Sequence, residues 1–152
     1  MSQNIRKKLL FIGKEVLIVG AIFLLVFAVS KPINSWFGQR ALDSTGLRYL
    51  SYAEANQLAE ETGKPVMLSF SSLWCGNCRR MDAQVFANAN VREKIESEYL
   101  IVRLDWDQDS DRRIFEKYGI SGFPTILIKQ PDTNTLSRLP TTFSPEQFLS
   151  FI

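Results

Sequence analysis

The segment Trp74-Cys75-Gly76-Asn77-Cys78 decides how this chain is interpreted, because it contains the only 2 cysteines among 152 residues. Two thiols separated by two residues at the start of a helix can close a disulfide and open it again. This chemistry needs one exposed thiolate and a second thiol close enough to displace whatever the first has captured. No cysteine is left for a structural disulfide. The pair therefore predicts redox chemistry.

Other roles for the cysteine pair fit the sequence less well. A zinc site takes four ligands, and the chain has no histidine and no second pair of cysteines. The acidic residues 105–111 lack the glycine of an EF-hand loop, so a calcium site is not expected either. Two inert, buried thiols are a further alternative. Because Trp74, Arg79 and Arg80 flank the pair, burial of both sulfurs is not expected. We expect no metal and no cofactor.

The charge is divided unevenly along the chain, whose net charge is +2. The first 40 residues contain 6 basic residues and 1 acidic residue, whereas the residues from Ala41 onward contain 12 basic and 15 acidic residues. A protein that binds nucleic acid would place its positive charge on the folded part, so we expect no nucleic-acid partner. At this length the chain has room for one domain and an extension.

Residues 16–29 form an unbroken apolar run, VLIVGAIFLLVFAV. The run alone is shorter than the roughly 20 residues of a membrane-spanning helix. Lys14 near one end, and Lys31 with Trp36 near the other, are suited to the two membrane interfaces. A buried core helix is not expected, because nothing else in the chain could cover a helix that is apolar on all sides. The run therefore predicts a transmembrane helix.

The flanks of the apolar run predict its orientation. Arg6, Lys7, Lys8 and Lys14 precede it, and by the positive-inside rule that end stays in the cytoplasm. A cleaved signal peptide is an alternative, because Ala28-Val29-Ser30 has small residues at the spacing that cleavage requires. We favour an uncleaved, single-pass anchor in the inner (cell) membrane. Either way, the thiols would face an oxidising compartment, periplasmic or otherwise extracytoplasmic.

The rest of the chain predicts alternating helices and strands. Residues 31–43 lack periodicity and are expected to form a linker. Strands are expected at residues 66–70, 100–104, 125–129 and 136–139. Helices are expected at residues 52–61, 79–86, 91–98 and 112–118, and after the N-cap Ser144. A strand–helix–strand unit followed by two adjacent strands predicts an α/β domain, with a mixed sheet and helices on both faces.

The cysteine pair follows a predicted strand, and Gly122-Phe123-Pro124-Thr125 precedes another, so the chain resembles the thioredoxin superfamily from about Ala53 to Ile152. The segment from Pro65 to Cys75, followed by a charged helix containing Val85-Phe86, is most similar to the C-terminal thioredoxin-like domain of DsbD-type thiol:disulfide interchange proteins. Such domains act in the periplasm as thiol reductants. Here a single anchor would replace their multi-span electron-delivery domain.

The resemblance implies a thioredoxin-like mixed sheet flanked by helices and preceded by one N-terminal transmembrane helix. We therefore divide the chain into four parts. These are residues 1–15 as a cytoplasmic n-region, residues 16–30 as the transmembrane anchor, residues 31–45 as a linker, and residues 46–152 as the thioredoxin-like domain.

The resemblance makes Cys75 the attacking thiol and Cys78 the resolving thiol. Physical reasoning agrees, because Cys75 would lie at a helix N-terminus, where unpaired N–H groups and the helix dipole favour a thiolate. Pro124 resembles the cis-proline that the family places opposite its cysteines, although a trans turn proline is the alternative. Trp74, Phe123 and Pro124 are expected to bind the substrate, unless Trp74 belongs to the core.

Two positions depart from the family pattern. The family often has a buried aspartate six residues before the first cysteine, and here that position is Ser69, which cannot act as a base. Either turnover at Cys78 is slower, or Asp105 or a water takes that role. The dipeptide Gly76-Asn77 replaces the Gly-Pro of thioredoxin itself. The side chain of Asn77 can donate a hydrogen bond toward the first sulfur, which would favour the reduced form.

These features predict a membrane-anchored periplasmic thiol–disulfide oxidoreductase that reduces protein disulfides. Its expected partners are protein disulfide or thiol substrates, the membrane, and an external thiol electron donor. That donor is needed because one helix without further cysteines cannot carry electrons across a membrane. Two alternatives stay open. One is a non-catalytic binding or assembly module, which Ser69 favours, and the other is a disulfide oxidase, which differs only in redox direction.

Overall fold

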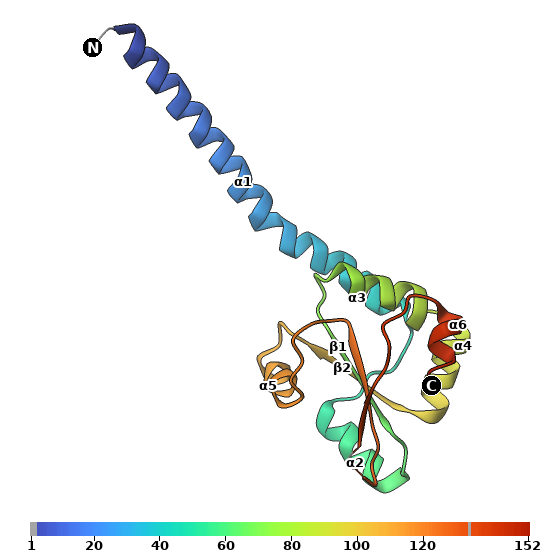
Figure 1. Cartoon of the computed structure of the whole chain (residues 1–152). Coiled ribbons are helices and arrows are strands. Elements are labelled where there is room, and N and C mark those ends of the chain that lie inside the picture. The colour runs from blue at the N-terminus through green and yellow to red at the C-terminus, as the bar shows by residue number, and fades with distance from the viewer. Residues whose placement is uncertain (1–2, 134) are drawn as a thin grey trace. The chain divides into compact units, whose positions relative to one another are not determined.

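The computed structural model describes residues 3–133 and 135–152, with the side chains of the first helix described from Gly13 onward. The chain divides into two compact units, Met1–Ile33 and Asn34–Ile152. The second unit contains the sheet (Figure 1) and both cysteines.

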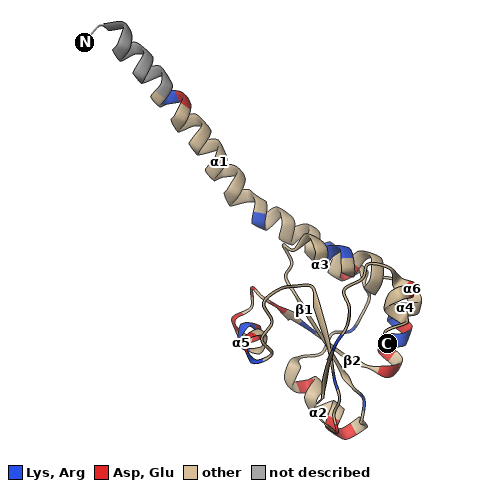
Figure 2. Ribbon diagram, viewed as in Figure 1, with Lys and Arg blue, Asp and Glu red and all other residues tan. Residues whose placement is uncertain are grey.

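Helix α1 (Gln3–Ser44) contains the whole of the apolar run. Figure 2 shows no charged residue on this helix between Glu15 and Lys31. The large apolar side chains between residues 16 and 29 are exposed in the structure, as expected of a helix that lies in an apolar medium. By its length and composition α1 is able to cross a membrane, as predicted.

Residues 31–43 are helical, because α1 continues to Ser44. The expectation of an irregular segment there is wrong, and packing within the unit Asn34–Ile152 gives the physical reason. Ala41 is buried, and Gly38 lies so close to Leu73 that an added Cβ would overlap the backbone carbonyl of Leu73. These contacts outweigh the weak periodicity and Pro32, which lacks the N–H of a helical hydrogen bond. The division of the chain into four parts stays a prediction.

A four-stranded mixed sheet forms the centre of the second unit (Figure 1). The strand order is β2 (Leu100–Asp105), β1 (Val66–Ser71), β3 (Thr125–Lys129) and β4 (Leu136–Arg138). Strand β1 is parallel to β2 and antiparallel to β3, and β4 is antiparallel to β3. All four strands lie where the sequence predicts them, and the mixed sheet is confirmed.

Helices cover both faces of this sheet. One face carries α2 (Tyr52–Thr62) and α5 (Asp109–Lys117). The other carries α3 (Gly76–Met81), the π-helix η1 (Asp82–Phe86), α4 (Ala89–Glu98) and α6 (Pro145–Leu149). Local signals set the ends of these helices. Ser51 and Ser144 accept N–H groups of the first turns of α2 and α6, and Gly63 ends α2 with φ at +72°.

Side chains of β1 alternate between the two faces of the sheet. Val66, Leu68 and Phe70 belong to the core under α2 and α5, together with Phe115. Met67 belongs to the other core, under α3, η1, α4 and α6. The alternation therefore places two serines of β1, Ser69 and Ser71, on the face that carries the cysteine helix α3.

Phe148→Ala will lower the free energy of unfolding by about 3–5 kcal/mol. Phe148 is fully buried and packs edge-to-face on Phe86, with ring centroids 5.6 Å apart, so alanine leaves a cavity. Urea unfolding of the full chain in mild detergent, followed by tryptophan fluorescence, measures the change. Phe151→Ala is the control, since Phe151 is 39% exposed. Equal losses in both variants would contradict the core position of Phe148.

Candidate functional site

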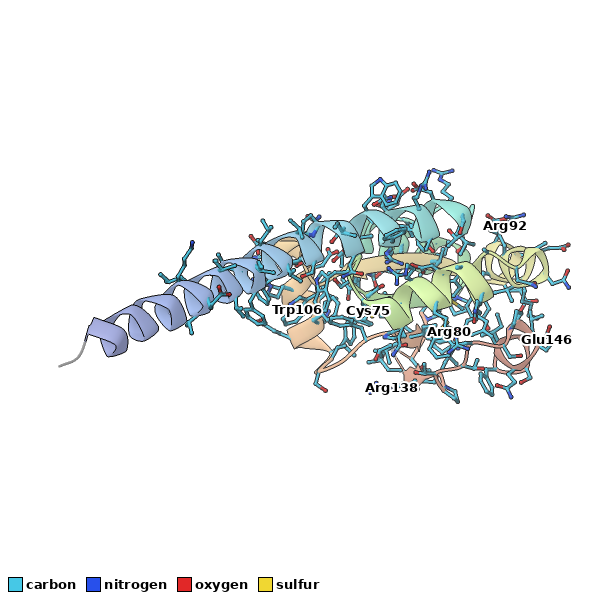
Figure 3. The ribbon with its side chains drawn as sticks, turned by 90° about the horizontal axis from the view of Figure 1, so that it is seen from above. Cys75, Arg80, Arg92, Trp106, Arg138 and Glu146 are labelled. Carbon is cyan, nitrogen blue, oxygen red and sulfur yellow. A yellow bond between two sulfur atoms is a disulfide. The ribbon has the colours of Figure 1, made fainter. Side chains whose placement is uncertain are left out.

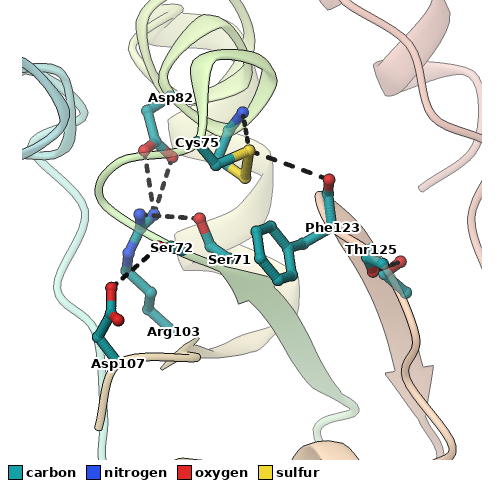
Figure 4. Close-up of a disulfide and its surroundings, with 10 residues drawn as sticks. Ser71, Ser72, Cys75, Asp82, Arg103, Asp107, Phe123 and Thr125 are labelled. Carbon is teal, nitrogen blue, oxygen red and sulfur yellow. Dashed lines mark hydrogen bonds and ion pairs between the residues drawn. A yellow bond between two sulfur atoms is a disulfide. The ribbon is translucent and has the colours of Figure 1, made fainter. Parts of the chain in front are cut away.

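Cys75 and Cys78 form a disulfide in this structure, with Cα atoms 5.2 Å apart (Figures 3 and 4). Cys75 is the N-cap residue of α3, and its sulfur accepts the backbone N–H of Cys78 at 3.1 Å. An N–H directed at sulfur stabilises negative charge on it when the disulfide is reduced. The first cysteine therefore has the helix N-terminal position that the sequence predicts.

Both sulfurs are more buried than their neighbours in the sequence suggest. Cys75 is 9% exposed and Cys78 is 1% exposed, so the expectation that the pair would not both be buried is wrong. The physical reason is a loop from elsewhere in the chain, because the carbonyl oxygen of Phe123 lies 3.9 Å from the Cys75 sulfur. Cys78 is the more buried of the two.

The loop before β3 lies opposite the cysteines, and the Phe123–Pro124 bond is cis, as predicted. At 3.9 Å a reduced Cys75 thiol would donate a weak hydrogen bond to the Phe123 carbonyl (Figure 4). Thr125 is buried, and its hydroxyl donates to the Gly122 carbonyl at 2.8 Å. These contacts hold the loop in place beside the Cys75 sulfur.

Aromatic rings line one side of the disulfide. Trp74 is 37% exposed, so it lies at the surface and not in the core. Its ring meets Phe123 edge-to-face, with centroids 5.6 Å apart. Phe123 in turn contacts Trp106 and Phe115, at centroid distances of 6.5 and 6.3 Å. An apolar surface beside Cys75 is thus continuous with the core under α5.

The remaining predicted site residues occupy different environments. Gly76 and Asn77 are exposed in the first turn of α3. In the described part of the chain, the backbone N–H of Cys78 reaches the Cys75 sulfur, and the Asn77 side chain does not. Ser69 is buried within β1 and pairs in register with Arg103 of β2. It supplies no carboxylate to the site.

A buried ion pair, which the sequence analysis missed, joins the cysteine helix to the sheet. Arg103 donates from Nη1 to both oxygens of Asp82 at 3.0 Å and from Nη2 to the Ser71 hydroxyl at 2.9 Å (Figure 4). The side chains of Arg103 and Asp82 are 8% and 2% exposed. The backbone N–H of Asp82 donates to the Cys78 carbonyl. The carboxylate one helical turn beyond Cys78 is therefore Asp82.

The sequence does contain a signal for this pair. Asp82 follows Cys78 by four residues and lies between Met81 and Val85 on the buried face of the helix. Arg103 lies between Val102 and Leu104 in β2. Opposite charges at two positions that apolar residues flank indicate an ion pair, because a buried charge without a partner is very unfavourable.

Asp105, the carboxylate that we considered for proton transfer, has other contacts. Its Oδ1 accepts the backbone N–H of Asp107 at 3.0 Å, and its own N–H donates to Asp111. Asp107 accepts the Ser72 hydroxyl at 3.2 Å. In the residues that the structure describes, no group of three or more histidine, cysteine or acidic side chains could hold a metal ion. The acidic segment acts as a hydrogen-bonded loop.

Arg103→Met will lower the free energy of unfolding near neutral pH by about 3–5 kcal/mol, because it leaves the buried Asp82 carboxylate without its cation. Burial already raises the folded-state pKa of Asp82, and Arg103 opposes that rise. A raised pKa favours folding below the unfolded pKa, and this contribution is lost as pH rises through the folded pKa. Since the variant raises the pKa further, its loss of stability will shrink on acidification.

Urea unfolding at several pH values measures this effect. The double variant Asp82→Asn/Arg103→Met is the control, since no buried charge remains in it. It will be more stable than Arg103→Met near neutral pH and less dependent on pH. A loss of stability in Arg103→Met that is the same at all pH values would show that Asp82 is not the group left unpaired.

Comparison with known proteins agrees with this geometry. Residues 52–152 match the family model of the thioredoxin-like domain. Protein disulfide-isomerase 1 of Dictyostelium discoideum is 30% identical over 79 residues, which cover 51% of this chain and 21% of that protein. The thiol:disulfide interchange protein DsbD of Klebsiella pneumoniae is 30% identical over 105 residues, which cover 64% of this chain and 18% of that protein. The chain thus spans about a fifth of the length of these relatives.

A solved structure gives the same fold. The C-terminal domain of DsbD from Neisseria meningitidis, in its oxidised form, superposes with a TM-score of 0.56 at 19% identity. The match covers 68% of this chain and 95% of that one. The likeness shows a thioredoxin-like fold, with a mixed sheet and flanking helices.

Proposed function

Since this chain belongs to the family of thioredoxin-like domains, we propose that it is a membrane-anchored thiol–disulfide oxidoreductase that reduces protein disulfides outside the cytoplasm. Cys75 would attack and Cys78 would resolve. The observation that carries the proposal is the setting of Cys75, whose sulfur accepts the Cys78 N–H at 3.1 Å and faces the Phe123 carbonyl. The names of the DsbD relatives support thiol–disulfide exchange as the reaction.

The reaction would begin from the reduced pair. The Cys75 thiolate attacks one sulfur of the substrate disulfide and forms a mixed disulfide, and the other substrate sulfur leaves and takes a proton from water. The Cys78 thiol then loses its proton and attacks the Cys75 sulfur. The second substrate sulfur leaves and is protonated. Two electrons pass to the substrate, and the protein ends with a Cys75–Cys78 disulfide.

The neighbours of the pair would take supporting roles. Trp74, Phe123 and Pro124 would contact the substrate, because they surround the attacking sulfur and Trp74 is partly exposed. The N-terminal turn of α3, which includes Gly76 and Asn77, would favour the thiolate. Ser69 supplies no base, and the carboxylate nearest along the helix, Asp82, is held by Arg103.

Membrane attachment belongs to the same proposal. Helix α1 would anchor the chain, and its basic residues before the apolar run would keep that end in the cytoplasm. The cysteines would then lie in the periplasm or another extracytoplasmic space. An external thiol donor must reduce the Cys75–Cys78 disulfide after each turnover, because the chain holds no further cysteines.

In an insulin-reduction assay with dithiothreitol, the full chain in detergent will accelerate reduction, and Cys75→Ser will return the rate to background. The reason is that no other sulfur can attack, since Cys78 is buried. Cys78→Ser will form a mixed disulfide with insulin that mass spectrometry detects, because the resolving thiol is gone. Ser97→Ala in α4 is the control for differences in protein preparation, and it will reduce insulin at the rate of the unchanged chain. A wild-type rate for Cys75→Ser would reject the proposal.

Maleimide labelling of intact cells tests location and redox state together, since Cys75 and Cys78 are the only thiols of the chain. A membrane-impermeant maleimide will label the protein without added reductant if the pair is exported and kept reduced. Labelling only after reduction would favour the oxidase alternative. Labelling only after permeabilisation would contradict the exported location. Ser2→Cys in a chain without Cys75 and Cys78 is the control, and it will react only in permeabilised cells.

A further inference from the structure

Three arginines come from α3, which carries the cysteines, and from β4, and we call them the arginine rim: Arg79, Arg80 and Arg138. The backbone N–H of Arg79 donates to the Cys75 carbonyl at 3.0 Å, and Arg80 follows it in α3. The residues from Ala41 onward contain more acidic than basic side chains, so the rim is a local exception to the charge of the folded part.

Arg138 reaches the site from β4, far from the cysteines in sequence. Its Nη2 donates to the Thr125 hydroxyl at 2.9 Å. Thr125 directly follows Pro124, and the carbonyl of the preceding residue, Phe123, faces the Cys75 sulfur. Arg138 thus places a positive charge on the side of the site opposite to α3.

Uncharged groups hold the two arginines of α3. The Arg79 guanidinium lies 5.7 Å from the ring centroid of Phe37, and that of Arg80 lies 4.3 Å from the ring centroid of Phe143. Arg80 also donates from Nε to the Gln84 side chain at 2.9 Å. Rings and amides orient a guanidinium without neutralising its charge.

No carboxylate forms a salt bridge with the rim within residues 13–133 and 135–152. The ion pairs of that part of the chain involve other cations, namely Lys94, Arg103 and Arg112. The acidic loop of Asp105 and Asp107 adjoins Trp106, on the aromatic side of the site. The rim therefore presents positive charge that the described protein does not compensate.

We propose that the arginine rim selects substrates in which acidic side chains flank the disulfide. This inference rests on the proposed function and specifies its substrate class. Within the described residues each rim guanidinium donates at most one hydrogen bond, so it keeps N–H donors in the forked geometry that suits a carboxylate. Acidic groups beside the target disulfide are attracted toward Cys75, and basic groups are repelled.

Two cyclic peptides of the same length, each closed by one disulfide, test this proposal. One carries glutamates on both sides of its cysteines, and the other carries lysines at the same positions. The full chain, reduced with dithiothreitol, freed of reductant and kept in neutral detergent, is mixed with each peptide, and the rate constant of reduction is measured. The glutamate peptide will react about tenfold faster at low ionic strength, and the ratio will approach one in about 0.5 M salt.

Variants of the rim test whether these arginines cause the difference in rate between the two peptides. Arg80→Gln and Arg138→Gln, both at exposed positions, will each lower the glutamate-to-lysine rate ratio about threefold. Arg113→Gln is the matched control, because it removes the same charge from an exposed position on α5 and will leave the ratio unchanged.

The outcomes separate this proposal from the one on which it rests. If both peptides are reduced at equal rates, or if the rim variants slow both peptides equally, the rim does not select substrates and this proposal is wrong. Equal slowing by the rim variants would mean that the rim acts on the thiolate for every substrate, and in both cases the oxidoreductase function stands. If the reduced protein reduces neither peptide, the proposed function fails, and the inference about the rim fails with it.

Discussion

The hydrogen bond from the Cys78 amide to the Cys75 sulfur exists only because α3 begins at Gly76, and the central sheet determines that point. Strand β1 is buried at every residue and has a partner strand on each side. The register of β1 against β3 brings the loop of Phe123 opposite the helix that follows β1. A shift of β1 by one residue would therefore displace both sides of the disulfide together.

The ion pair of Asp82 and Arg103 has a different role from the apolar contacts around it. A buried ion pair seldom stabilises a fold more than well-packed apolar side chains would. The pair instead favours one arrangement of helix and sheet, because Arg103 of β2 bonds both Asp82 in η1 and Ser71 at the end of β1. We infer that the pair specifies how the helix carrying Cys78 sits on the sheet.

The strands and the cysteine helix are predictable from the sequence because their signals are local, such as the apolar run at residues 66–70 and the caps Ser51 and Ser144. The features that the sequence did not predict all depend on contacts between distant parts of the chain. The loop that buries Cys75 lies 48 residues further on, and Asp82 and Arg103 are 21 residues apart. Likewise, the helix at residues 31–43 is stabilised by packing within the unit Asn34–Ile152, which no local pattern encodes.

The close approach of Gly38 to Leu73 affects how the protein should be truncated for solution work. The match to the family begins at residue 52, which invites a soluble fragment that starts there. Such a fragment would lack the helical turn that covers Leu73, the residue before Trp74. It would also lack Phe37, against which Arg79 is held. Trimming at the family boundary would thus remove part of the surroundings of the cysteine pair, although Cys75, Cys78 and the cis-proline loop would remain.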